Sequence, residues 1–92
     1  MEKKTKRGRL EIMKDVLFII RENRNMIKIT PLLRKSNLSS TRFQEYFLEL
    51  LEKGFIREIE SKKGKSISLT DKGFKFLERY QTIIHFIDEF EL

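Results

Sequence analysis

The stretch over residues 30–73 most constrains how this chain can fold, because helix and turn signals follow one another in it without a gap. Thr30 and Pro31 predict a helix start, since a Thr hydroxyl can cap free backbone N–H groups and Pro is tolerated in the first helical turn. Asn37 tolerates a left-handed conformation and can close this short helix. Ser39 can then cap a second helix. We therefore expect two helices joined by a tight turn.

The second helix should bury one apolar stripe and end at Gly54. The stripe recurs at steps of three and four residues and consists of Phe43, Tyr46, Phe47, Leu50 and Leu51. Two short extended runs follow, which contain Ile56 with Ile59 and Ile67 with Leu69. The segment over residues 61–65 between them is rich in lysine, so the pattern predicts a hairpin with a basic tip. Helix, turn, helix and basic hairpin, in this order, are typical of a winged helix-turn-helix.

Further helices are expected on both sides of this stretch. Apolar spacing predicts one from about Leu10 to Asn23, and Thr70 can cap another that runs to about Glu89. The segment over residues 27–29 could add a short third strand. The predicted fold is α+β and mostly helical, with a basic disordered arm at 1–8, a winged helix-turn-helix domain at 9–70 and a long C-terminal helix at 71–92.

Composition bounds the class of protein. Ninety-two residues are enough for one domain with a modest core, and ten aromatic residues indicate a folded chain. The chain has no cysteine, so disulfide bonds and thiolate metal sites are excluded, which fits a reducing compartment. No apolar run approaches the roughly 20 residues of a membrane helix. We expect a cytoplasmic protein, associated with the nucleoid if it binds DNA, and no membrane partner.

The net charge of +6 is concentrated in two places. Residues 1–9 carry five basic residues against one acidic residue, and residues 61–70 carry three lysines and no acid. By contrast, residues 71–92 hold five acidic and three basic residues. The arm is as compatible with a solvated tail as with DNA contact. The hairpin lysines stand beside a predicted recognition helix, and we favour the interpretation that they contact phosphates.

The second helix and its surroundings supply the predicted DNA contacts. Hydroxyls and amides can reach phosphates or base edges, and Arg can bind guanine through two hydrogen bonds. The predicted DNA-binding residues are Arg34, Lys35, Ser39, Ser40, Thr41, Arg42, Gln44, Lys62, Lys63 and Lys65. The helix itself has two basic and three acidic residues between Ser39 and Lys53, so its basic flanks should supply most of the affinity. Glu45 could accept from a cytosine amine, but a solvated carboxylate is the favoured reading.

The last helix has more apolar surface than one small domain can cover. A seam at steps of three and four residues predicts a homodimer interface, with Ile12 and Ile19 of the first helix as further candidates. The predicted interface residues are Leu77, Tyr80, Ile83, Ile84, Ile87 and Phe90. The alternative is that this helix folds back on its own domain.

Several short segments resemble a family of small archaeal winged-helix proteins, which are predicted transcriptional regulators and include dimeric chromatin-associated members. The matching segments are Arg9–Ile12, Lys35–Ser39, Tyr46 with Phe47 and Leu50, Glu52–Ile56, and Leu69–Gly73 with Phe76 and Leu77. The resemblance implies a homodimer held by an antiparallel coiled coil of the last helices, which presents two recognition helices to DNA.

An enzyme is not expected. The lone His85 lies among apolar residues of the last helix, and no nucleophile and base pair, metal-ligand spacing or phosphate-binding loop is present in the sequence. We expect no cofactor, and no feature marks a small-molecule effector site. The main alternative to DNA binding is a winged helix that docks on a transcription complex through its apolar last helix. RNA binding is a weaker third reading, because no aromatic stacking platform is evident.

Overall fold

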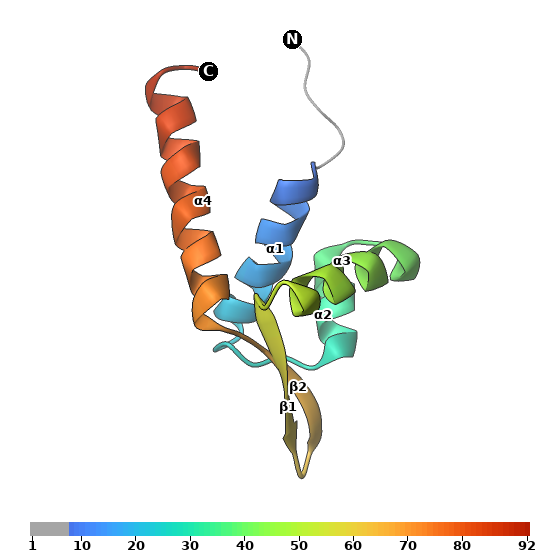
Figure 1. Ribbon diagram of the computed structural model, residues 1–92. Helices are drawn as coiled ribbons and strands as arrows, with labels where there is room; N and C mark the ends of the chain where they lie inside the picture. The colour runs from blue at the N-terminus through green and yellow to red at the C-terminus, as the bar shows by residue number, and fades with distance from the viewer. Residues whose placement is uncertain (1–7) are drawn as a thin grey trace.

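The computed structural model describes residues 8–92 of the chain (Figure 1). The elements follow in the order α1 (Arg9–Glu22), α2 (Ile29–Ser36), α3 (Ser40–Glu52), β1 (Ile56–Ser61), β2 (Gly64–Leu69) and α4 (Asp71–Glu89). This confirms the predicted α+β fold, which is mostly helical with one two-stranded sheet. All of the predicted arm except Gly8 lies outside the described residues.

Helix α2 starts earlier than predicted. The N–H of Leu32 bonds to the carbonyl of Lys28 at 3.1 Å, so Lys28 occupies the capping position and Thr30 lies inside the helix. The expected cap at Thr30 is therefore wrong. Pro31 still falls in the first turn, where its missing N–H costs nothing. Asn37 closes α2 with φ 61° and ψ 33°, the left-handed conformation predicted for it.

Both ends of α3 follow the sequence signals. The Ser39 hydroxyl accepts a hydrogen bond from the Arg42 N–H at 3.2 Å and caps the first turn. At the other end Gly54 adopts φ 78°, and the Phe55 N–H returns to the Leu50 carbonyl at 2.9 Å. This return bond after a left-handed residue is the Schellman pattern, and it turns the chain directly into β1.

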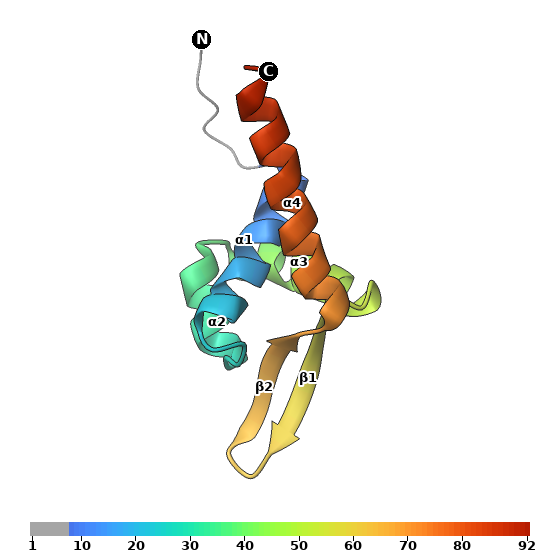
Figure 2. The same cartoon turned by 90° about the vertical axis from the view of Figure 1, so that its left-hand side faces the viewer.

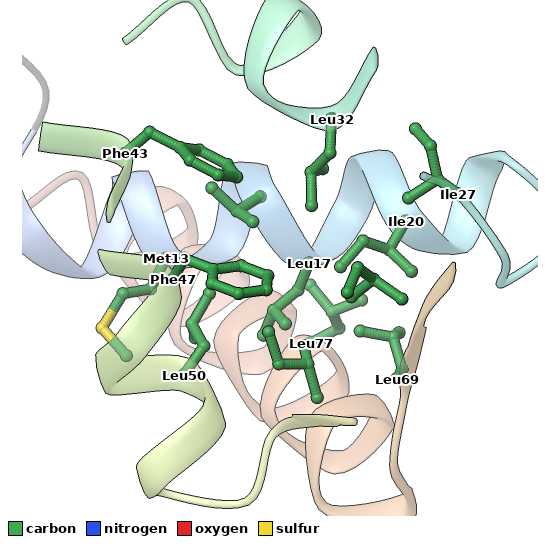
Figure 3. Close-up of a cluster of buried hydrophobic side chains, with 13 residues drawn as sticks. Met13, Leu17, Ile20, Ile27, Leu32, Phe43, Phe47, Leu50, Leu69 and Leu77 are labelled. Atoms are coloured by element: carbon green, nitrogen blue, oxygen red, sulfur yellow. The ribbon is translucent and has the colours of Figure 1, made fainter. Parts of the chain in front are cut away.

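The core forms around α1, which contributes more buried side chains than any other element (Figure 3). Phe43 and Phe47 of α3 stack with ring centroids 5.6 Å apart. The buried cluster takes side chains from every element and from the linker between α1 and α2, and comprises Met13, Val16, Leu17, Ile20, Ile27, Leu32, Phe43, Phe47, Leu50, Ile56, Ile67, Leu69 and Leu77. Because the base of α4 shares this core, its direction relative to the domain is fixed.

The hairpin of β1 and β2 is antiparallel, with register from Ile56 opposite Leu69 to Ser61 opposite Gly64. We call it the wing. Next to β2 the predicted third strand is reduced to a single bridge between Ile27 and Ile67, whose two hydrogen bonds measure 3.1 and 2.7 Å. It extends no further because the next turn of chain already belongs to α2.

The last helix leaves the domain on the side away from the wing, as Figures 1 and 2 show. Its start is capped by Thr70, whose hydroxyl accepts from the Gly73 N–H at 3.1 Å and donates to the Gly54 carbonyl at 2.5 Å. Leu77 packs into the core, whereas most residues after Tyr80 are exposed. The predicted long C-terminal helix is thus present, with its second half standing clear of its own domain.

Candidate nucleic-acid interface

The outer face of α3 carries short polar side chains around one exposed leucine. Thr41, Gln44 and Glu45 are exposed and line a shallow hollow together with Ser40 and Leu48. Leu48 is 49% exposed, on the side opposite the buried phenylalanines. Leu48 was not among the predicted contact residues. The apolar side chain of Leu48 could contact a thymine methyl group, which the polar side chains around it cannot do as favourably.

Two of the predicted contact residues on α3 are already engaged locally. The Ser39 hydroxyl accepts the capping bond with one of its two lone pairs, so its donor hydrogen and the second lone pair remain for a partner. The guanidinium of Arg42 lies 5.8 Å from the ring centroid of Tyr46 and is exposed. Stacking on the ring orients Arg42 along the helix surface without removing it from solvent.

The acidic charge of α3 is partly neutralised by contacts that the sequence did not reveal. Glu49 forms an ion pair with Arg9 of α1 and lies 3.9 Å from Lys53, with its side chain only 25% exposed. In the N-terminal half of α3, Glu45 is then the only carboxylate, opposed by Arg42. The face that would meet DNA is close to neutral rather than acidic.

Positive charge flanks this face on the α2 side. Arg34 and Lys35 are exposed in the last turn of α2, where cations also interact favourably with the helix dipole. Only residues 37–39 separate α2 from α3, so the last turn of α2 is close along the chain to the start of α3. This is the placement that the sequence predicted.

The wing lysines do not form a uniform set. Lys65 lies 3.8 Å from Glu58 and 3.9 Å from Glu60, two carboxylates on the paired strand. Within residues 8–92, Lys62 and Lys63 at the tip have no ion-pair partner. Free positive charge at the wing is therefore concentrated on these two exposed side chains.

A further lysine joins the wing from a distant part of the chain. Lys28, just before α2, donates from its ammonium group to the Lys63 carbonyl, a contact across 35 positions. It is exposed, so its charge adds to that of the wing tip. No local sequence signal marks this contact, because it depends on how the α1–α2 linker lies along β2.

A family model described as winged helix-turn-helix matches residues 6–88. The chain belongs to the winged helix-turn-helix family. Two solved structures similar to this winged-helix chain are described as DNA-binding proteins. Sso10a-2 from Sulfolobus solfataricus has a TM-score of 0.73 at 22% identity, over 92% of this chain and 86% of that chain. F93 from STIV has a TM-score of 0.71 at 21% identity, over 86% of this chain and 91% of that chain.

A third similar structure, F-93 of SSV1, has a TM-score of 0.66 at 25% identity, over 87% of this winged-helix chain and 88% of that chain. None of the three is described as an enzyme. No protein of curated function gives a significant match. Among residues 8–92 the structure has no helix long and apolar enough to cross a membrane.

The side chains predicted to form a dimer interface of this winged helix fall into two groups. Ile83 and Phe90 are 54% and 58% exposed, and Phe86, which sequence reasoning left out, is exposed beside them. Leu77 differs from the expectation, since it is only 6% exposed and packs in the core of its own chain. Ile12 is also buried within the chain. The free apolar surface therefore belongs to the second half of α4.

Proposed function

We propose that this protein binds double-stranded DNA as a homodimer and acts as a transcriptional regulator or an architectural DNA-binding protein. The observation that carries the proposal is the arrangement of charge around α3. Its N-terminal half is polar and exposed, Arg34 and Lys35 stand in the last turn of the preceding helix α2, and the wing that follows α3 carries the exposed lysines. The printed descriptions of Sso10a-2 and F93 as DNA-binding proteins support the same reading.

In this proposal α3 enters the major groove with its N-terminal half. Arg42 and Gln44 are the side chains with the donor geometry to read guanine and adenine edges, and Leu48 can contact a thymine methyl group. Because α3 is nearly neutral on this face, affinity comes from phosphate contacts at its flanks. Those contacts involve Lys62 and Lys63, supported by the charge of Lys28.

A salt titration of duplex binding tests this division of roles. We expect the Lys62→Ala, Lys63→Ala double variant to bind more weakly across sequences and to reduce the log–log salt slope by about 0.9 per lost phosphate contact. Lys65→Ala should change the slope less, because two carboxylates already offset its charge. Lys14→Ala is the matched control, since Lys14 lies over the Tyr80 ring between α1 and α4.

An unchanged salt slope in the double variant would exclude the wing from phosphate contact. A wild-type protein that binds no duplex at low salt would refute the proposed function. Comparison of random with genomic fragments separates the two roles, since weak sequence preference indicates an architectural protein and sharp preference a regulator.

The homodimer part of the proposal depends on α4. Its second half exposes the large side chains Ile83, Phe86, Ile87 and Phe90, and clusters of this kind mark interaction sites. The same surface also favours the second candidate function, a module that docks on a different protein. Light scattering distinguishes the two, because a homodimer doubles the mass, whereas a clean monomer at micromolar concentration favours the docking module.

A further inference from the structure

A shallow apolar hollow of about 350 Å³ lies where the base of α4 meets the start of α1. Three aromatic rings form much of its lining. Phe55 and Phe76 meet edge to face with centroids 5.1 Å apart, and Phe76 stacks with Tyr80 at 6.3 Å. Leu10 and Ile83 extend the apolar lining, and both are more than half exposed. A hollow of this size lies at the lower end of the range for small-molecule sites, about 300–1,000 Å³.

The floor of the hollow is held by backbone hydrogen bonds. Phe55 stands between α3 and β1, and its N–H donates to the Leu50 carbonyl at 2.9 Å. Its carbonyl accepts from the Thr70 N–H at 3.1 Å, directly before α4. The base of α4 packs so closely on this carbonyl that Gly73 leaves no room for a Cβ atom. The floor is therefore largely formed in the free protein, as is usual for sites that bind small molecules.

The rim of the hollow is cationic. Lys72, Lys75 and Arg79 follow one another at steps of three and four residues along one side of α4, and all three are exposed. The Lys72 ammonium donates to the Lys53 carbonyl at 2.7 Å and lies 5.1 Å from the centroid of the Phe55 ring. Within residues 8–92, Lys75 and Arg79 have no ion-pair partner. No acid is among the residues that line the hollow, so its rim attracts an anionic group.

An apolar floor beneath a positive rim selects an occupant with an apolar body and a negative group. DNA does not match, because its backbone is charged along its whole length and α4 leaves the domain on the side away from the wing (Figure 1). A protein partner also fits poorly, since eight residues line the hollow, whereas a standard interface takes about 20–30 residues a side. The rings of the floor favour an aromatic body, because ring pairs add stabilisation beyond the area that they bury.

We propose that this hollow binds a small aromatic carboxylate. The rings of the ligand lie on Phe55, Phe76 and Tyr80, and its carboxylate meets the charged groups of Lys75 and Arg79. The site goes beyond the proposed function and does not rest on it, because none of the residues that line it is among the predicted DNA contacts. No local signal in the sequence marks the site, since its lining joins the start of α1, the α3–β1 connection and α4.

Titration with 2-naphthoate, followed by the amide NMR shifts of the protein, tests the proposal. We expect saturable binding with a dissociation constant of about 1 mM or below, as the ligand efficiency of small molecules implies. The largest shifts should fall on the residues that line the hollow. The neutral analogue 2-naphthamide has the same rings and should bind about three- to tenfold more weakly, because it forms no ion pair with the exposed rim.

A double variant separates the rim from the floor. Lys75→Gln with Arg79→Gln should lower the affinity for naphthoate about three- to tenfold and change that for naphthamide less than about twofold. Leu10→Ser reduces the apolar lining instead and should weaken the binding of both compounds equally. The matched control is Arg21→Gln with Lys62→Gln, which removes two cations from a different hollow and from the wing tip. It should leave both affinities within about twofold.

Circular dichroism of each variant establishes that it folds. Wild-type protein without saturable naphthoate binding would overturn the site, and shifts confined to the wing would overturn its placement. Equal wild-type affinities for the two compounds, or equal losses in the rim variant, would overturn the contact with the carboxylate.

The titration is repeated at several protein concentrations, because Tyr80 and Ile83 also belong to the predicted dimer interface. A dissociation constant for naphthoate that does not depend on protein concentration supports a site that stays open in the homodimer. A constant that rises with protein concentration would mean that a second copy covers the hollow. That result would overturn the ligand site and leave the proposed homodimer standing.

Discussion

Gly73 is the position where the structure gives the sharpest prediction about stability. A Cβ atom at this residue would lie 2.2 Å from the Phe55 carbonyl oxygen and 3.4 Å from the Leu69 side chain. The close neighbour is backbone and cannot rotate away. Gly73→Ala therefore forces the base of α4 away from the α3–β1 connection by about 1 Å if ordinary van der Waals separation is to be restored.

The size of the effect follows from three contributions. Overpacking of this kind costs about 1–3 kcal/mol. Separation also weakens the Thr70 N–H bond to the Phe55 carbonyl, now 3.1 Å, whose loss costs about 1 kcal/mol. The higher helix propensity of Ala relative to Gly offsets this loss of stability by about 1 kcal/mol. We expect the free energy of unfolding to fall by about 2 kcal/mol, which lowers Tm by about 8–16 °C in a domain of this size.

Thermal melts followed by circular dichroism measure this change. Wild type and variant must be compared at one protein concentration, because a homodimer melts at a temperature that depends on concentration. Gln81→Ala is the control, since Gln81 is exposed on the same helix and should leave Tm nearly unchanged. A Gly73→Ala protein that melts at or above the wild-type temperature would refute the steric argument.

One further prediction uses another part of the chain. Asn37→Ala should lower the free energy of unfolding in urea by about 1 kcal/mol, because Asn37 has φ 61°. Asn37→Gly should be nearly neutral, and equal losses in both variants would point to a role for the Asn side chain instead.

Much of the fold could be predicted because its signals are local. Ser39 and Thr70 cap the helices that they were expected to cap, and Asn37 and Gly54 take the left-handed conformations that end α2 and α3. In each case the information lies within a few residues of the boundary. The start of α2 was misplaced at Thr30 because its actual N-cap, Lys28, makes no side-chain capping bond and so leaves no local signal in the sequence.

The parts that sequence reasoning missed depend on contacts between distant segments. The ion pair of Arg9 with Glu49 joins the start of α1 to α3 and changes the charge balance of α3. The apolar pattern of α4 contains two neighbouring stripes, and periodicity alone does not tell which one faces α1. Leu77 lies on the stripe that the core uses, so it was wrongly grouped with the residues that remain exposed.

The segment over residues 25–28 runs along the wing and contacts it at three levels, two on β2 and one in the turn before it. The Asn25 side-chain oxygen accepts from the Leu69 N–H at 2.7 Å, Ile27 pairs with Ile67, and Lys28 reaches the Lys63 carbonyl near the tip. An isolated two-stranded hairpin is only marginally stable in water, whereas this one is braced along its length. Binding through such a wing requires less loss of conformational entropy, so its lysines act as a preorganised contact whose spacing is set before any ligand arrives.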